Sequence, residues 1–156
     1  MNYDEVIKII EKLFKSTKFV TLATADKLGV VSTAQMCLIN DGLKVFMQTD
    51  NKFEKLKNIA ENPHVAINIG AFNFKGAAKI VGHPTENKVF IKNLKQKHLE
   101  TYEHYTNLKD EVLIEIELIQ AKIWGVDNSK DVHNQETILV VDFKNKTTKT
   151  IVCDKM

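Results

Sequence analysis

Residues 46–63 read FMQTDNKFEKLKNIAENP, and this stretch says more about the fold than any other. Its apolar start indicates a strand that ends at Thr49, and the residues that follow indicate a helix that Asn62-Pro63 stops. At such a junction the first helical N–H groups have no helical partner, and the positive end of the helix dipole lies beside them. Because the Thr49 hydroxyl and the ammonium groups of Lys52 and Lys55 fall in the same stretch, it predicts a phosphate-binding site.

The alternative is that these lysines bind no ligand, because lysines in the first turn of a surface helix are usually solvated. The chain contains no arginine, however. Any anion that it binds therefore has to be held by lysine, backbone N–H groups and hydroxyls.

The composition is that of a soluble globular protein, and 156 residues are expected to form a single domain, residues 1–156. The net charge is only +2, and lysines and acids are interspersed, so no nucleic-acid partner is expected. No apolar run is long enough to span a membrane, and the acidic N-terminus is unlike a signal peptide. Cys37 and Cys153 form no CxxC motif. We therefore expect a cytoplasmic protein with reduced thiols and no membrane partner.

Hydrophobic periodicity predicts many short strands and a few helices. Asn2 and Glu5 form a possible capping box for a first helix that runs to about Lys15. Strands are predicted at residues 19–25, 30–39, 43–48, 64–69, 76–81, 112–117, 121–124, 138–143 and 148–152, and further helices at 51–61 and 86–105. This order predicts a mainly β, α+β fold, namely a β-barrel with helical additions.

Several short motifs occur in a recognisable order along the chain. They are the strand Phe19–Ala25 with a turn that ends at Gly29, the strand Ser32–Leu38, Thr49 with Lys55 six residues later, Asn62-Pro63, the strand Gly76–Gly82 and the pair Ile123-Trp124. In this order the chain resembles the FMN-binding split-barrel family related to pyridoxamine 5′-phosphate oxidase. It is most similar to the small bacterial members of the general-stress-protein type.

The resemblance implies an FMN cofactor in a groove between the two subunits of a homodimer. The strand that includes Ser32, Thr33, Ala34, Gln35 and Met36 would bind the isoalloxazine ring, largely through its backbone. The ring and the ribityl chain would be lined by Met47, Gln48 and Thr49. The phosphate would be held by Lys55 with help from Lys52, and Trp124 would approach the flavin from the same or the other subunit.

The sequence also departs from the true pyridoxamine-phosphate oxidases. Ala34 stands where they have an arginine, and Phe53 stands where they have a serine. Their Arg-x-His-x-Arg element, which binds the substrate phosphate, has its counterpart in residues 131–135 (DVHNQ), which contain neither arginine. These departures argue against a phosphorylated substrate.

The favoured hypothesis is therefore an FMN-dependent oxidoreductase that transfers hydride to or from an unidentified small molecule. The sequence indicates no catalytic acid or base. The alternative is a split barrel that binds FMN or haem without turnover. A nucleic-acid-binding barrel is disfavoured, because the strands show no alternation of basic and aromatic residues. Glu100 and His104 share a predicted helix face, but no convergent partner is evident, so no metal site is expected.

Overall fold

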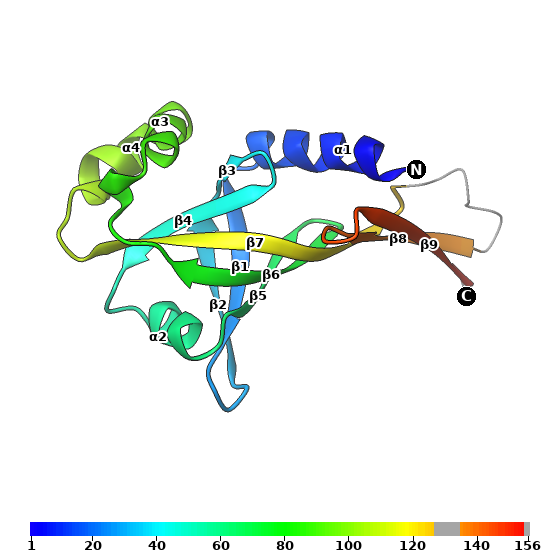
Figure 1. Ribbon diagram of the computed structural model, residues 1–156, viewed down its shortest axis with the longest axis horizontal. Coiled ribbons are helices and arrows are strands. Elements are labelled where there is room, and N and C mark those ends of the chain that lie inside the picture. Colours follow the sequence, from blue (N-terminus) through cyan, green and yellow to red (C-terminus); the bar gives the residue numbers. More distant parts are fainter. Residues whose placement is uncertain (127–134, 155–156) are drawn as a thin grey trace.

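The computed structural model describes residues 1–126 and 135–154, and in these residues nine antiparallel strands form one curled sheet (Figure 1). The strand order is β2-β1-β5-β6-β7-β4-β3. In addition, β8 pairs with the C-terminal part of β7, and β9 pairs with β8. The strands are β1 (Phe19–Ala25), β2 (Val31–Cys37), β3 (Ile39–Asp41), β4 (Lys44–Asp50), β5 (His64–Ile69), β6 (Phe72–Ile80), β7 (Glu111–Trp124), β8 (Gln135–Asp142) and β9 (Thr147–Asp154). The predicted α+β split barrel is confirmed.

The sheet closes at one end because the strand is interrupted at Leu38, between β2 and β3. The sequence predicts one strand over residues 30–39, but β2 pairs with β1 and ends at Cys37, whereas β3 pairs with β4. The backbone N–H of Leu38 donates to Lys18 O at 3.0 Å, and Leu38 O accepts from Lys97 Nζ at 2.8 Å. Lys97 also donates to Phe14 O at 2.7 Å. These bonds satisfy backbone groups that the break would otherwise leave without partners.

The longest strand, β7, runs without interruption where the sequence predicts two strands with a bend between them. On β6 the register shifts between Lys75, which faces Gln120, and Gly76, which faces Leu118. Ile119 is therefore an extra residue, and such a bulge bends a strand without ending it. A side chain at Gly76 would lie 2.8 Å from Glu117 O, so only glycine allows this close approach.

The main core fills the inside of the curled sheet and is covered by two helices. The helix α1 (Tyr3–Ser16) begins with the predicted Asn2–Glu5 capping box and buries Val6, Ile10 and Phe14. In Figure 1 it lies above the strands and α2 (Glu54–Glu61) lies below them, and α2 contributes Leu56 and Ile59 to the same core.

A second, smaller cluster lies on the other face of β4. It consists of Ile39, Phe46, Phe90, Leu94 and Leu113. Two of these residues belong to α3 (Lys88–Lys97), which follows the short 3₁₀ turn η1 (Pro84–Glu86) and precedes α4 (Leu99–Thr101) and the π-helical turn η2 (Tyr102–Thr106). The strand β4 is therefore buried on both faces, which explains its continuous apolar run.

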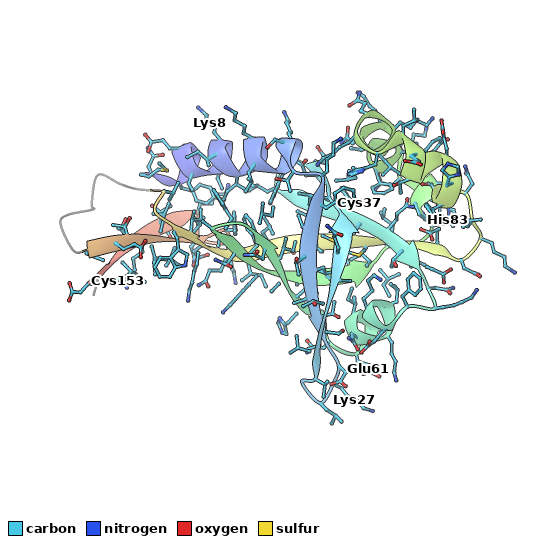
Figure 2. All side chains as sticks on the ribbon, turned by 180° about the vertical axis from the view of Figure 1, so that it is seen from behind. Lys8, Lys27, Cys37, Glu61, His83 and Cys153 are labelled. Carbon is cyan, nitrogen blue, oxygen red and sulfur yellow. The ribbon has the colours of Figure 1, made fainter. Side chains whose placement is uncertain are left out.

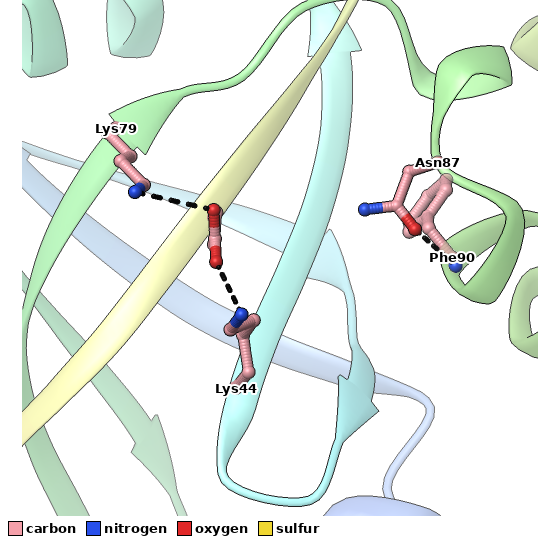
Figure 3. A network of polar contacts seen from close by, with 5 residues as sticks. Lys44, Lys79, Asn87 and Phe90 are labelled. Carbon is pink, nitrogen blue, oxygen red and sulfur yellow. Dashed lines mark hydrogen bonds and ion pairs between the residues drawn. The ribbon is translucent and has the colours of Figure 1, made fainter.

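Polar contacts fix the elements around this cluster (Figure 3). The Asn87 side chain accepts from Phe90 N at 2.9 Å and so caps α3. On the outer face of the sheet, Glu115 of β7 contacts Lys44 of β4 at 3.0 Å and Lys79 of β6 at 3.7 Å. These ion pairs join three adjacent strands.

The two cysteines lie far apart, Cys37 at the end of β2 and Cys153 in the terminal hairpin, and both thiols are free (Figure 2). Among the described residues, no helix combines the length and the apolar character needed to cross a membrane.

A buried amide holds α2 against the sheet. Asn58 is 3% exposed, and its Nδ2 donates to Thr24 Oγ1 at 3.0 Å and to Ser32 Oγ at 3.1 Å. The helix is thereby tied to both β1 and β2. Because Thr24 is only 3% exposed, the amide satisfies a hydroxyl that would be costly to bury alone.

We expect Asn58→Ala to lower the free energy of unfolding by ~1–3 kcal/mol, because it removes both hydrogen bonds and leaves a small void. Urea denaturation of the purified protein measures the change. The matched control is Lys57→Ala, at an exposed position on the same helix, which should stay within about 0.5 kcal/mol of wild type. Equal midpoints for the two variants would show that the amide contributes nothing.

Candidate functional site

The barrel is open between β2 and β4. Beyond Phe46, where its pairing with β3 ends, β4 is paired only to β7 in the described sheet. In the same sheet β2 is paired only to β1, which leaves its outer edge available. An edge strand presents backbone N–H and C=O groups to whatever lies beside it. The opening can therefore bind the polar edge of a ligand through the backbone.

A cavity of ≈ 230 Å³ lies at this opening. It is lined by Leu22, Thr24, Ser32, Thr33, Ala34, Phe53, Glu54 and Lys55. Its volume is below the range of about 300–1,000 Å³ that is typical for a site enclosing a whole small ligand. The cavity suits one end of a larger ligand whose remainder lies along the strand edge.

The first turn of α2 forms one wall of this cavity. The helix begins at Glu54, three residues later than predicted, because Asn51–Phe53 form a turn in which Lys52 N donates to Asp50 Oδ1 at 2.8 Å. Phe53 occupies the N-cap position, and its side chain cannot accept a hydrogen bond. The helix N-terminus therefore has no side-chain cap, and its free backbone N–H groups can bind an anion.

Lys55 is the cation that lines the cavity. Its Nζ lies 4.5 Å from the centroid of the Phe53 ring, which gives the ammonium a cation–π contact. Burial lowers the pKa of Lys55, and the negative charge of Glu111 acts in the opposite direction. Glu54 brings a carboxylate to the same wall. A ligand phosphate would meet one partly desolvated ammonium and one carboxylate here.

Lys52 does not converge with Lys55. Its Nζ forms an ion pair with Asp110 Oδ2 at 3.3 Å, and its side chain is 72% exposed. In addition, Asn51 N donates to Asp110 O at 2.9 Å. The prediction that Lys52 helps to hold the phosphate is therefore not supported by its position: Lys52 fastens the turn before α2 to the segment before β7.

The predicted residues of β4 face two different environments. Met47 is fully buried in the main core and Thr49 is 6% exposed, so the structure does not bring their side chains to the cavity. Gln48 points to the other face, where Nε2 donates to Glu111 Oε2 at 3.1 Å and Oε1 accepts from Thr106 Oγ1 at 2.9 Å. Burial first and the charge of Asp50 second raise the pKa of Glu111.

The predicted residues of β2 alternate in direction, as strand geometry requires. Ser32 and Ala34 line the cavity, Met36 is buried in the core, and Gln35 lies exposed on the outer face. Thr33 is exposed and also lines the cavity. The side chains of Ser32 and Ala34 therefore join Lys55 at the site, whereas Thr33, Gln35 and Met36 can contribute only backbone.

Trp124 does not line this cavity. In the sheet register, Leu22 of the cavity lies opposite Ile67, Ile67 lies opposite Phe74, and Phe74 lies opposite Ala121, three residues before Trp124 on β7. The indole is 45% exposed.

The sequence analysis missed the roles of three residues at the site, namely Glu54, Asn58 and Glu111. Asn58 and Glu111 are buried polar residues, and no periodicity distinguishes them from exposed ones. The residues at 131–134, where the substrate-phosphate motif of the oxidases was sought, lie outside the described part of the chain. Within the described part, no three histidine, cysteine, aspartate or glutamate side chains are grouped so that they could hold a metal ion.

Comparison with known proteins agrees with this geometry. A family model described as pyridoxamine 5′-phosphate oxidase matches residues 7–125. No curated protein matches the sequence.

Three solved structures are similar to the chain. General Stress Protein 26 from Bacillus anthracis has 19% identity and a TM-score of 0.60, with 75% of this chain and 92% of that one covered. HutZ, the heme storage protein from Vibrio cholerae, has 18% identity and a TM-score of 0.64, with 80% and 96% covered. ChuZ from Campylobacter jejuni has 13% identity and a TM-score of 0.72, with 94% and 63% covered. At such identities the likeness establishes the fold alone.

Proposed function

Because this chain belongs to the pyridoxamine 5′-phosphate oxidase family, we propose that it binds FMN at the opening between β2 and β4 and acts as an oxidoreductase on an unidentified small molecule. The observation that carries the proposal is the cavity where Lys55, the first turn of α2 and the edge of β2 meet. When bound, FMN supplies hydride-transfer chemistry.

The residues present fit the parts of FMN. An apolar plate with a polar edge can lie along β2, whose outer edge offers backbone donors and acceptors. The phosphate suits the ammonium of Lys55 and the N–H groups at the start of α2. Glu54 reduces the positive potential there, so the phosphate end is expected to bind more weakly than in a site with two cations.

We expect the purified protein to take up FMN and to lose ten- to a hundred-fold in affinity on Lys55→Ala, because a charge-assisted contact contributes ~1.5–3 kcal/mol. Lys57→Ala, on the exposed side of the same helix, is the matched control and should bind FMN like wild type. Titration with FMN at fixed salt, followed by fluorescence, measures the affinity of the wild type and of both variants. A wild type that fails to bind micromolar FMN would refute the cofactor assignment.

We also propose that the protein does not oxidise pyridoxine or pyridoxamine 5′-phosphate. Neither arginine of the oxidases' substrate-phosphate motif is present in residues 131–135, and a phosphate buried without a cation is costly. The FMN-loaded protein should therefore form no detectable pyridoxal phosphate from either substrate. Sustained turnover of one of them would overturn this proposal.

We further propose a homodimer in which the partner subunit completes the site. The outer face of the sheet carries an open, mainly apolar groove of ≈ 470 Å³ whose lining includes Ala23, Val31, Ala66 and Ile119. Val31 is 65% exposed in the protomer, and a second copy would cover this surface. The partner subunit's Trp124 could then reach the flavin.

Light scattering of the FMN-bound protein should give twice the mass of the 17.8 kDa chain. Val31→Glu should shift the protein toward the monomer and weaken FMN binding together, because a charge would be buried at the interface. Gln35→Glu, at an exposed position on the same strand and face, is the control for added charge alone. A wild-type monomer that binds FMN would contradict the dimer.

The alternative function is a binding module for haem or FMN without turnover. The fold of this chain is similar to that of HutZ, which is described as a heme storage protein, and this similarity supports a binding module as the alternative. The visible spectrum after addition of FMN or haemin separates the two ligands. Reduction of bound flavin by NADH or NADPH, followed by reoxidation with an added acceptor, separates an enzyme from a module.

A further inference from the structure

A cavity of ≈ 610 Å³ lies beside the middle of β7, where the sheet has a gap. Two strands share one edge of β7: β4 covers this edge up to Ile116, and β8 covers it again from Gln120. The opposite edge is paired to β6. The three residues in between, Glu117–Ile119, therefore have no strand opposite them on the β4 side in the described sheet. Two of them, Glu117 and Leu118, line the cavity.

The walls of the cavity come from elements that are far apart in the sequence. Leu43 precedes β4, Phe143 follows β8, and Tyr3 is the first residue of α1. The chain before α1 is fastened to β9, because Thr148 Oγ1 donates to Met1 O at 3.0 Å. All three wall residues pack against the main core. The cavity thus has apolar walls that the fold itself holds in place.

Charged side chains complete the lining. They are Lys44, Lys79, Lys146, Glu115 and Glu117. The carboxylate of Glu115 is shared, since its Oε1 lies 3.0 Å from Lys44 Nζ and its Oε2 lies 3.7 Å from Lys79 Nζ (Figure 3). Lys146 forms no ion pair within the part of the chain that the structure describes. Three ammonium groups thus line the cavity with two carboxylates, which leaves one positive charge in excess.

We propose that this cavity binds a small amphiphile that has one anionic headgroup and an apolar body, of which a medium-chain carboxylate is the simplest example. The aliphatic and aromatic walls suit the body, and the excess ammonium charge suits a single negative headgroup. A cation would add to the excess positive charge, so the lining selects against it. The volume lies within the range of about 300–1,000 Å³ that is typical for small-ligand sites.

The amphiphile site is separate from the two sites proposed above. None of its lining residues lines the cavity at the FMN opening or the groove where a partner subunit is proposed to pack. Binding of the amphiphile should therefore neither require FMN nor compete with it. For the same reason, a protein that fails to bind FMN would still allow this proposal to be tested.

The first experiment is a calorimetric titration of the wild-type protein with hexanoate, octanoate and decanoate below their micelle-forming concentrations. One molecule should bind per chain, and affinity should rise about three- to four-fold per added CH₂, because each CH₂ enters the apolar part of the cavity. Octanamide, which lacks the charge, should bind about ten-fold more weakly than octanoate. Failure of all three carboxylates to bind saturably, or equal binding of octanoate and octanamide, would overturn the proposal.

The second experiment removes the unpaired cation. Lys146 has a φ of 54°, a conformation that asparagine adopts more readily than lysine, so Lys146→Asn should fold. It should bind octanoate about ten-fold more weakly than wild type. Lys144→Asn, in the same turn but outside the lining, is the matched control and should stay within about two-fold. Equal affinities of the two variants would contradict the assignment of the headgroup.

The third experiment locates the apolar body. Ala77 lines the cavity and lies opposite Glu117 in the β6–β7 register, so Ala77→Phe should fill the space and abolish octanoate binding without a change of charge. Circular dichroism checks that this variant is folded, and Lys146→Asn decides the question if it is not. Saturating FMN should leave the octanoate affinity of the wild type unchanged. Displacement of octanoate by FMN, or wild-type affinity in folded Ala77→Phe, would place the ligand elsewhere and refute the proposal.

Discussion

Leu38 is the point at which the chain leaves the β1 ladder and joins β4, and the geometry of the site depends on this change of partner. Because β2 ends at Cys37 and β3 pairs only with the start of β4, the barrel is closed at one end and open at the other. The break is possible because Lys18 and Lys97 satisfy the backbone groups of Leu38. A continuous strand could not provide both the closed end and the opening.

The helix α2 packs beside the opening, against β1 and β6, and its first turn makes the opening into a candidate binding site. Asn58 bonds to a hydroxyl on β1 and to one on β2, so the helix is held by directional contacts as well as by Leu56 and Ile59. Its first turn is thereby held beside the edge of β2. A preorganised N-terminus of this kind can bind an anion without first paying to order the loop.

Much of the architecture follows from local patterns. The Asn2–Glu5 capping box, the β8–β9 hairpin and the junction between β4 and α2 appear where periodicity and turn residues predict them. The patterns fail at Leu38 and at Ile119, since a change of strand partner and a bulge depend on distant strands. They also do not show where the side chains of Lys52 and Met47 lie. The position of a residue in a loop or strand does not say which way its side chain points when both faces of β4 are buried.

The sequence by itself determined that this chain forms a split barrel of the pyridoxamine 5′-phosphate oxidase family and that, without arginine, any anion has to be held by lysine, backbone N–H groups and hydroxyls. Only the tertiary structure decided that Lys55 lines the cavity while Lys52 pairs with Asp110. The reason is physical: strand and helix periods are local and readable along the chain, whereas burial and charge pairing depend on contacts between residues far apart in sequence.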